Sequence, residues 1–364
     1  MAAPTADFRS DTMTRPTPAM RQAMAAAEVG DDVWGEDPTV RALEVEGATV
    51  LGKPAALFVP SGTMANQVAI HVHCRAGDEL ICEERSHVYF YEGGSIARLS
   101  GTQVRLLAAT DGFPQPAQVE AAVRDQGDPH FPRSRLLVLE NSHNMAGGRI
   151  ANAARMHALA AAAKRHGMLV HVDGARLLNA AVALGCKASE LVAAVDSTTL
   201  CLSKGLGAPV GSLLAGEVAF VTEARRVRKA FGGGMRQAGI LAAAGLLALR
   251  EGPALLATDH ARAKELARGL AELPWCTVDP AATETNIVML DLPTGSPGVD
   301  PLALLAHLQS HGVLAAKAGP RRIRFVLHRD VGDDGVQRCL SACRTFVPAV
   351  AGKSPSSTSQ RPSF

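Results

Sequence analysis

Short apolar runs alternate with stretches of helical spacing along most of the chain. The apolar runs predict buried strands over residues 57–59, 79–82, 104–107, 135–140 and 168–173. Apolar residues three and four positions apart predict helices over 40–51, which Thr39 is expected to cap, and over 64–74, 116–126 and 152–166. Nearly continuous apolar strands that alternate with amphipathic helices form a mostly parallel sheet with helices on both faces. The pattern therefore predicts an α/β fold.

The pattern changes after residue 252. A strand over 211–216 and a helix over 218–230 continue the first pattern, and a long helical region over 237–273 is interrupted at Gly252 and Pro253. A proline interrupts a helix because it lacks the backbone N–H. Beyond the break, the sequence predicts strands over 286–291 and 322–328 and a helix over 301–312. This mixture is typical of a small α+β domain.

These elements predict four segments. Residues 1–30 form an N-terminal arm and a helix, and residues 31–252 form the large domain. Residues 253–350 form the smaller C-terminal domain. The Ser/Pro-rich residues 351–364 are expected to be a disordered tail, since they offer little apolar surface to bury.

Composition is that of an ordinary globular protein, since 47% of the 364 residues are hydrophobic and 20% are charged. The formal net charge is +2 and both signs are interspersed, so the sequence does not indicate a basic patch that binds nucleic acid. The seven cysteines are widely spaced and include no CxxC pair, so we expect reduced thiols, no metal site and a cytoplasmic protein. The N-terminus lacks the apolar core of a signal peptide, and no run has the length to cross a bilayer, so no membrane partner is expected.

One lysine stands at a glycine-rich turn after an apolar strand. Ser203 and Lys204 end the apolar run, and the residues that follow it break any helix: Gly205, Gly207, Pro209 and Gly211. A lysine on a surface loop is normally a solvated cation. Here the apolar surroundings favour the neutral amine, and the glycines allow a bound molecule to approach the backbone. Both features suit a lysine that forms a Schiff base.

Polar residues follow the predicted strands at one edge of the sheet, where parallel sheets bind ligands. They are His87, His143, Asp173 and Lys204. Each alone is equally compatible with a structural role. Asp173 can pair with the protonated ring nitrogen of a pyridine cofactor. Arg176 can contact a phenolate or carboxylate oxygen, or form a structural pair with the aspartate.

Two turns have the composition of anion sites. Ser61, Gly62 and Thr63 open a helix, where free N–H groups attract a phosphate, although a plain N-cap has the same sequence. The basic helix over 218–230, which includes Lys229, leads into three glycines followed by Arg236. A solvated helix face is the ordinary explanation for such a charge run. The glycine turn can also complete an anion site at a subunit boundary.

Two further groups offer contacts to a substrate. Ser10 lies in a dense polar cluster of the N-terminal arm, over residues 9–15. Arg322 and Arg324 alternate along a strand and therefore face one side, where either can hold a carboxylate. Arginines on an exposed sheet face show the same alternation, so the pattern alone leaves both alternatives open.

Six motifs, in order along the chain, resemble the low-specificity L-threonine aldolases. This family belongs to the aspartate-aminotransferase-like, fold type I class of pyridoxal phosphate enzymes. The motifs are DFRSDTMTRPT (7–17), PSGTMANQ (60–67), HVDGARLLNA (171–180), LSKGLGAPVGS (202–212), GGGMRQAG (232–239) and IRFVLH (323–328). The resemblance implies a large domain with a mostly parallel sheet of the seven-stranded type, a smaller C-terminal α+β domain, and pyridoxal 5′-phosphate as the cofactor.

The resemblance also implies roles for individual residues. Lys204 would form the Schiff base, Asp173 would pair with the ring nitrogen, and His87 would stack on the ring. The implied cofactor-binding set is Ser61, Gly62, Thr63, His87, Asp173, Arg176, Ser203, Lys204, Lys229 and Arg236. The implied substrate contacts are Ser10, Arg176 and Arg324 at the carboxylate, with Tyr91 at a position where the family varies. His143 matches a histidine near the substrate hydroxyl.

The implied reaction is retro-aldol cleavage of L-threonine or L-allo-threonine to glycine and acetaldehyde. Either His143 or His87 can accept the hydroxyl proton, directly or through water. The same cofactor residues also serve β-elimination and transamination, and a non-catalytic binding protein on this scaffold is a further alternative. The family implies a homodimer or homotetramer with sites at the subunit interface.

Overall fold

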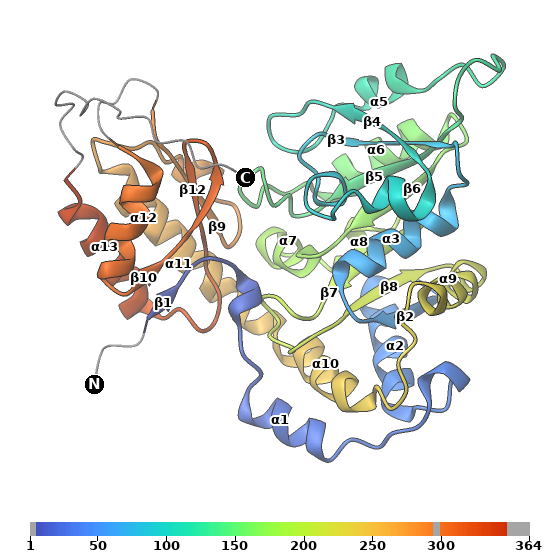
Figure 1. The fold of residues 1–364 in the computed structure, drawn as a ribbon, viewed down its shortest axis with the longest axis horizontal. Helices are drawn as coiled ribbons and strands as arrows, with labels where there is room; N and C mark the ends of the chain where they lie inside the picture. Colours follow the sequence, from blue (N-terminus) through green and yellow to red (C-terminus); the bar gives the residue numbers. More distant parts are fainter. Residues whose placement is uncertain (1–4, 294–298, 348–364) are drawn as a thin grey trace, which may run out of the picture.

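The computed structural model describes residues 5–293 and 299–347 (Figure 1). Its centre is a seven-stranded sheet, which confirms the predicted mostly parallel sheet. The strand order is β2 (Ala55–Val59), β8 (Ser212–Gly216), β7 (Ser197–Cys201), β6 (Leu169–Asp173), β5 (Ser134–Glu140), β3 (Glu79–Glu83) and β4 (Gln103–Leu107). Only β8 runs antiparallel to its neighbours. The predicted tail, 351–364, lies outside the described residues.

Helices cover both faces of this sheet (Figure 1). The helices of this part of the chain are α1 (Pro18–Ala25), α2 (Pro38–Leu51), α3 (Gly62–His73), α4 (His87–Phe90), α5 (Pro116–Ala122), α6 (Ala153–Lys164), α7 (Leu177–Leu184), α8 (Ala188–Leu191), α9 (Val218–Ala230) and α10 (Gly239–Glu251), of which α1 packs against α10. Phe58 of β2 belongs to the largest apolar core, whereas its neighbours Leu57 and Val59 pack with α3 and α9. Because successive side chains of a strand point to opposite faces, both faces are buried. This burial explains the nearly continuous apolar runs.

The start of α2 differs from the expectation that Thr39 caps it. Asp37 is the cap, and its Oδ1 accepts a hydrogen bond of 3.0 Å from the N–H of Val40. Pro38 occupies the first helical turn, where its missing N–H costs nothing. Thr39 lies inside the helix and donates its hydroxyl to the carbonyl of Glu28 at 2.6 Å.

The C-terminal part contains a three-stranded antiparallel sheet in the order β11-β12-β9. Its elements are α11 (Pro253–Ala271), β9 (Ile287–Asp291), α12 (Pro301–Ser310), β10 (Val313–Leu314), β11 (Ala316–Gly319), β12 (Arg322–Val326) and α13 (Asp333–Thr345). Helix α11 contributes Leu256 to the core of the large sheet and Ala263 to a separate C-terminal core. One helix therefore supports both cores, and the domain boundary at residue 253 stays a prediction.

Helices α10 and α11 meet at the predicted break with a bend of 63°. Among the described residues, no single helix combines the length and the hydropathy of a membrane span, and these two reach them only together.

The N-terminal arm joins the C-terminal core. Strand β1 (Ala6–Asp7) pairs in parallel with β10, and Phe8 is buried with its ring edge-on to Phe325 at 5.9 Å. A short 3₁₀ turn, Asp11–Met13, then leads the chain toward the large sheet. The arm is thereby anchored at one end while its polar cluster reaches the space between the two sheets (Figure 1).

Candidate active site

The carboxyl ends of β2, β7, β6, β5 and β3 lie at one edge of the large sheet. The pairing register shows this directly, since Glu140 is opposite Asp173, and Ser212 joins Val59 to Cys201. The segments that follow these strands carry the start of α3, His87, His143, Asp173 and Lys204. The structure therefore brings the predicted residues to a common edge, as expected for a ligand site in a parallel sheet.

Asp173 is a buried carboxylate with two defined donors. Its Oδ2 accepts from Asn66 Nδ2 at 2.8 Å, and its Oδ1 accepts from the N–H of Ala175 at 3.0 Å. Burial alone would raise the pKa of Asp173, but the charges of His87 and Lys204 and these hydrogen bonds hold the pKa below its usual value. Asp173 is therefore an ionised acceptor, which suits a cationic partner.

A hydrogen-bond chain behind Asp173 fixes the orientation of Asn66. His171 Nε2 lies 3.2 Å from Asn66 Oδ1, and His171 Nδ1 and His73 Nε2 both contact the hydroxyl of Ser197, at 2.8 and 2.7 Å. Burial lowers the pKa of His171 to about 3 and that of His73 to about 4, so both rings are neutral. Neutral His171 donates to the oxygen of Asn66, which turns the Asn66 amide nitrogen toward Asp173. Sequence reasoning missed these residues, although polar Asn66 on an apolar helix face was a signal.

The backbone carbonyl of Lys204 accepts two hydrogen bonds. They come from Thr14 Oγ1 at 2.9 Å and from the N–H of Gly207 at 2.8 Å. Gly207 has a φ of +83°, and a Cβ there would overlap the guanidinium of Arg329. The Arg329 guanidinium also donates to the carbonyl of Gly207 at 3.2 Å. The glycine is therefore required by both conformation and space.

The amine of Lys204 lies between two acidic groups. Its charge lowers the pKa of Asp173 and that of Asp11 in the N-terminal arm. The side chain is partly exposed, in contrast to the buried Leu202 before it and the buried Gly205 after it. A partly exposed lysine near a buried carboxylate is available to a bound molecule.

His87 opens α4 and is held by a carboxylate. Its Nδ1 lies 2.8 Å from Glu92 Oε1, and its backbone N–H donates to Glu140 at 2.7 Å. Burial lowers the pKa of His87, but the bond to Glu92 and the charges of Asp173 and Glu140 outweigh it, so the pKa is raised. The ring of Tyr91, which is half exposed, lies 5.7 Å from the His87 ring.

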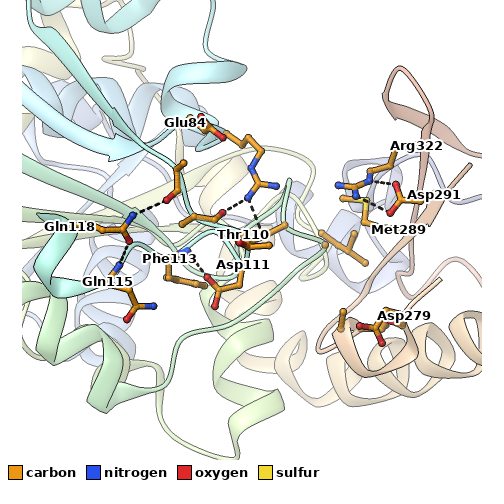
Figure 2. Close-up of a pocket in the computed structure, with 18 residues that line it drawn as sticks. Glu84, Thr110, Asp111, Phe113, Gln115, Gln118, Asp279, Met289, Asp291 and Arg322 are labelled. Carbon is orange, nitrogen blue, oxygen red and sulfur yellow. Dashed lines mark hydrogen bonds and ion pairs between the residues drawn. The ribbon is translucent and has the colours of Figure 1, made fainter. Parts of the chain in front are cut away.

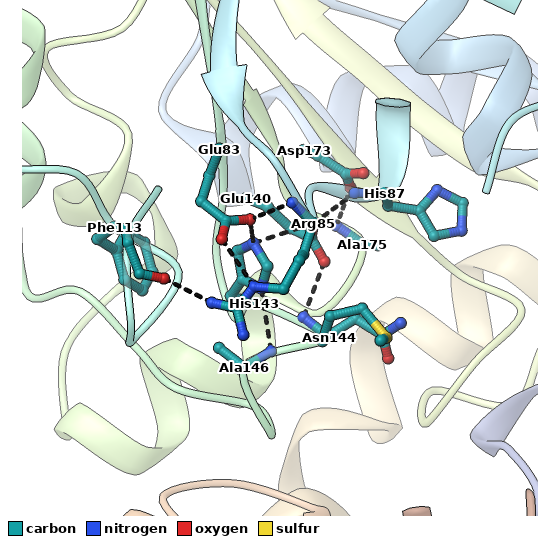
Figure 3. Close-up of polar contacts among 12 residues, drawn as sticks. Glu83, Arg85, His87, Phe113, Glu140, His143, Asn144, Ala146, Asp173 and Ala175 are labelled. Atoms are coloured by element: carbon teal, nitrogen blue, oxygen red, sulfur yellow. Dashed lines mark hydrogen bonds and ion pairs between the residues drawn. The ribbon is translucent and has the colours of Figure 1, made fainter. Parts of the chain in front are cut away.

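His143 is wholly buried in a different polar group (Figure 3). Its Nδ1 accepts from the N–H of Ala146 at 3.2 Å. Its Nε2 lies 3.1 Å from Glu83 Oε2, an ion-pair distance without the alignment of a hydrogen bond. Burial lowers the pKa of His143, and the charges of Glu140 and Glu83 raise it further than burial lowers it. Figure 3 shows the His87 ring directed away from this group, so the two histidines occupy separate environments.

Arg176 pairs with the N-terminal arm rather than with Asp173. Asp11 accepts from Arg176 Nε at 2.7 Å and from Nη2 at 2.8 Å, and both side chains are buried. The charge of Arg176 overcomes the effect of burial and holds the pKa of Asp11 at about 2. The contact spans 165 residues of sequence, so the pattern around Arg176 contained no signal for it.

Arg324 retains free hydrogen-bonding capacity. Its Nη1 donates to Asn144 Oδ1 at 2.8 Å, while its buried Nε has no partner among the described residues. Arg322, two positions earlier, is committed to Asp291 through two bonds of 2.6 and 2.9 Å. Burial and the charge of Arg176 lower the pKa of Arg324, so a bound anion would stabilise its charged form. Of the two arginines, only Arg324 has a buried guanidinium nitrogen without a partner among the described residues.

Ser10 lies in the same arm as Asp11 and caps the 3₁₀ turn. Its Oγ accepts from the N–H of Thr12 at 3.2 Å and from the Thr12 hydroxyl at 2.9 Å. The neighbouring backbone carbonyl of Arg9 accepts from Arg324 Nη2 at 3.3 Å. The arm therefore reaches Arg324, as required if Ser10 contacts the same ligand group.

The start of α3 forms an N-cap with free N–H groups. Ser61 Oγ accepts from the N–H of Met64 at 3.2 Å, and Ser61 is exposed. The glycine turn after α9 is adjacent, since a Cβ on Gly233 would overlap the sulfur of Met64. Lys229 and Arg236 flank this turn and are exposed, with Arg236 paired to Asp31 at 2.9 Å.

The basic run of α9 is not a uniformly solvated face. Arg228 is 1% exposed and pairs with Asp32 at 2.7 Å, and it also donates to the carbonyl of Phe58 at 2.7 Å. Arg225 pairs with Glu44 at 2.7 Å. Two of these arginines therefore fasten the N-terminal loop and α2 to the sheet, because their long side chains reach acids that are distant in sequence.

The cavity shown in Figure 2 has a volume of about 830 Å³ and lies beside this site rather than in it. The cavity lies between the loop after β4, which contains Thr110 and Asp111, and the Arg322–Asp291 pair. Neither Asp173 nor Lys204 lines it. A smaller cavity of about 600 Å³ is lined by Tyr91, Met145 and Arg322 among others. The reactive groups therefore lie at the sheet edge, with these cavities toward the C-terminal sheet.

Comparisons with known proteins agree with this architecture. A model of the beta-eliminating lyase family matches residues 7–293. Low-specificity L-threonine aldolase 1 of Arabidopsis thaliana is 46% identical over 338 residues, which cover 92% of this chain and 94% of the relative. The low specificity L-threonine aldolase of Escherichia coli K12 is 42% identical over 342 residues, which cover 94% and 99%. A solved threonine aldolase of Leishmania major has a TM-score of 0.78 and 19% identity, over 93% of this chain and 98% of that one, and so supports the fold.

Proposed function

This chain belongs to the beta-eliminating lyase family, among the low-specificity L-threonine aldolases, and we propose on this basis that it cleaves L-threonine and L-allo-threonine to glycine and acetaldehyde. Related β-hydroxy-α-amino acids would yield glycine and other aldehydes. The observation that carries the proposal is the meeting of Lys204 with the buried carboxylate Asp173 at one sheet edge. An amine and an ionised carboxylate are the two groups by which such enzymes hold and activate pyridoxal phosphate.

The residues at this edge fit pyridoxal 5′-phosphate. Asp173 offers an ionised acceptor for a protonated ring nitrogen, and the amine of Lys204 would attach the cofactor covalently. His87 would lie on the ring, and Arg176 would face the phenolate oxygen. The phosphate would be held by Ser61, Gly62, Thr63, Ser203, Lys229 and Arg236. When bound, the cofactor supplies a cationic ring that accepts the electron pair left at the substrate Cα.

Arg324 is the proposed anchor of the substrate carboxylate. Its buried Nε has no partner among the described residues, so a carboxylate would satisfy it. Ser10 and Nη1 of Arg176 would complete the contact, since Asp11 holds Nε and Nη2 of Arg176 and Nη1 has only a long bond of 3.4 Å to Asn144 Oδ1. A carboxylate held this way orients the bond to be broken at Cα.

The proton of the substrate hydroxyl must leave as the Cα–Cβ bond breaks. His143 has Nδ1 committed to Ala146 and Nε2 directed at Glu83, and it is fully buried. His87 has only Nδ1 committed, and its side chain is 28% exposed. The geometry therefore favours Nε2 of His87 as the acceptor, directly or through water. Tyr91 is proposed to bound the same side of the site.

Product analysis tests the proposal. The purified protein is supplied with pyridoxal phosphate and incubated with L-threonine, L-allo-threonine, phenylserine and serine. Glycine and the matching aldehyde are the expected products. Ammonia with 2-oxobutyrate from threonine would instead indicate β-elimination. A protein without visible imine absorption, and unchanged by borohydride, would indicate a binding protein.

We also infer the setting in which the enzyme works. A homodimer or homotetramer with sites at subunit interfaces is supported by the exposed aromatic residues Trp34, Tyr89, Phe90 and Tyr91, of which Tyr91 lies beside His87. A cytoplasmic location is supported by the seven cysteines, all of which are free thiols. Sedimentation at several concentrations measures the oligomeric state.

A further inference from the structure

Glu92 joins the two groups that flank the candidate cofactor site. It follows α4, and its side chain is fully buried. Its Oε1 is 2.8 Å from His87 Nδ1 and accepts from Asn66 Nδ2 at 2.9 Å, and its Oε2 accepts from Gln67 Nε2 at 2.6 Å. A ring nitrogen of His87 and one carboxylate oxygen each of Glu92 and Asp173 lie within 4.8 Å of one another.

We propose that Glu92 is a positioning residue that holds the His87 proton on Nδ1 and, through Asn66, supplies Asp173 with its side-chain donor. The inference rests on the proposed function, which gives His87 and Asp173 their tasks. Glu92 itself does not touch the reacting atoms in this scheme. Its effect passes through two side chains, His87 and Asn66.

The hydrogen-bond pattern fixes the His87 tautomer. A carboxylate only accepts, so the proton of the shared bond must sit on Nδ1 of His87. Nε2 then has its lone pair free in the neutral ring. Among the described residues, no hydrogen bond to that nitrogen is present. The carboxylate thus leaves Nε2 free for proton transfer.

Asn66 transmits the second effect. Its single amide nitrogen donates one hydrogen to Glu92 and the other to Asp173, while its oxygen faces neutral His171. A flipped amide would place its oxygen against two carboxylates and its nitrogen against a donor. The acceptor on Glu92 and the donor on His171 therefore select the same orientation, which is the one that Asp173 needs.

Replacing Glu92 by glutamine breaks this pattern without a large change of volume. A glutamine side chain has one oxygen and one amide nitrogen, whereas the site presents donors to both positions. Either Gln67, or the pair His87 and Asn66, would then face another donor. The other charges that raise the pKa of His87, those of Asp173 and Glu140, remain in place.

¹⁵N NMR of the histidine side chains in the holoenzyme tests the inference. The chain has 12 histidines, and a His87→Gln variant assigns the signal of His87. In the wild type, neutral His87 is expected to carry its proton on Nδ1. In Glu92→Gln, the pKa of His87 is expected to fall by about one pH unit, as the loss of a charge-assisted hydrogen bond implies. The affinity for pyridoxal phosphate, followed by its visible absorption, is expected to fall as Asn66 loses its second acceptor.

Glu83→Gln is the matched control, because Glu83 lies 3.1 Å from Nε2 of buried His143, the second histidine near the site. This change is expected to lower the pKa of His143 and to leave the His87 signal in place. An unchanged His87 pKa in Glu92→Gln, or a wild-type proton on Nε2, would overturn the inference. If Glu92→Gln does not fold, the position of the proton on wild-type His87 still tests the inference. If the wild type instead lacks visible absorption and forms no aldehyde, the proposed function itself has failed.

Discussion

Replacement of Arg324 by glutamine separates substrate binding from stability. Arg324 lies on β12, with Nη1 bonded to Asn144, Nη2 bonded to the Arg9 carbonyl, and a buried Nε without a partner among the described residues. Glutamine retains an amide donor but is shorter, and it removes the charge and the planar fork that holds a carboxylate through two bonds. We therefore expect threonine cleavage to weaken while the C-terminal sheet stays folded.

The expected loss follows from the contacts. A hydrogen bond to a charged group contributes about 1.5–3 kcal/mol, and each 1.4 kcal/mol is about tenfold in affinity. The value of kcat/KM for L-threonine should thus fall by about 10- to 150-fold. Because the carboxylate also orients the bond to be broken, part of this loss is expected in kcat.

Arg322→Gln supplies the matched control on the same strand. Arg322 is bonded to Asp291 and lines the neighbouring cavity rather than the site. Acetaldehyde release from L-threonine, coupled to reduction by NADH and an alcohol dehydrogenase, measures both variants. An unaltered kcat/KM in Arg324→Gln, or an equal loss in Arg322→Gln, would refute the assignment of Arg324 to the carboxylate.

Three further predictions concern the supports of the site. Asp11→Ala should lower the unfolding free energy by about 3–5 kcal/mol in denaturant titration, because it leaves Arg176 buried without its acid. In the wild type, the stabilisation from this ion pair should disappear as pH falls from about 4 through about 2, where folded Asp11 becomes protonated. Both carboxylate oxygens of Asp259 are buried without a partner among the described residues, and burial raises the pKa of Asp259 to about 7. Ionisation of Asp259 therefore destabilises the fold as pH rises from about 4 to 7. Asp259→Asn should raise Tm more at pH 8 than at pH 5, and an equal change at both would contradict this. Gly207→Ala should reduce stability and cofactor affinity because it overlaps Arg329, whereas Gly185→Ala, with open space and a φ of +64°, should cost only about 1 kcal/mol of backbone strain in thermal melts.

The sequence carried enough information to predict the large sheet, because its strands are buried on both faces and read as apolar runs. Residues after those strands were therefore placed correctly at one edge. The two-residue strand β1 left no periodic pattern, and its pairing with β10 joins opposite ends of the chain. Short pairings of this kind depend on tertiary packing and not on local sequence.

Contacts within the site were predictable only where they follow from strand ends. The salt bridge of Arg176 with Asp11, and the bond of Thr14 to the Lys204 carbonyl, each join positions far apart in sequence. Asn66 lies in a recognised motif and Glu92 follows Tyr91, yet their roles as linking groups require the relative placement of α3, α4 and β6. The motif residues thus indicated the chemistry, whereas the side chains that hold them in place could be identified only from the structure.

The product ratio from L-threonine tests the central claim most directly. Wild-type protein with pyridoxal phosphate and a Lys204→Ala variant are each incubated with L-threonine, and glycine and acetaldehyde are quantified. The wild type is expected to form the two products in equal amounts, and Lys204→Ala is expected to lose both the visible absorption and the cleavage. Full turnover by Lys204→Ala, or release of 2-oxobutyrate with ammonia by the wild type, would contradict the assignment.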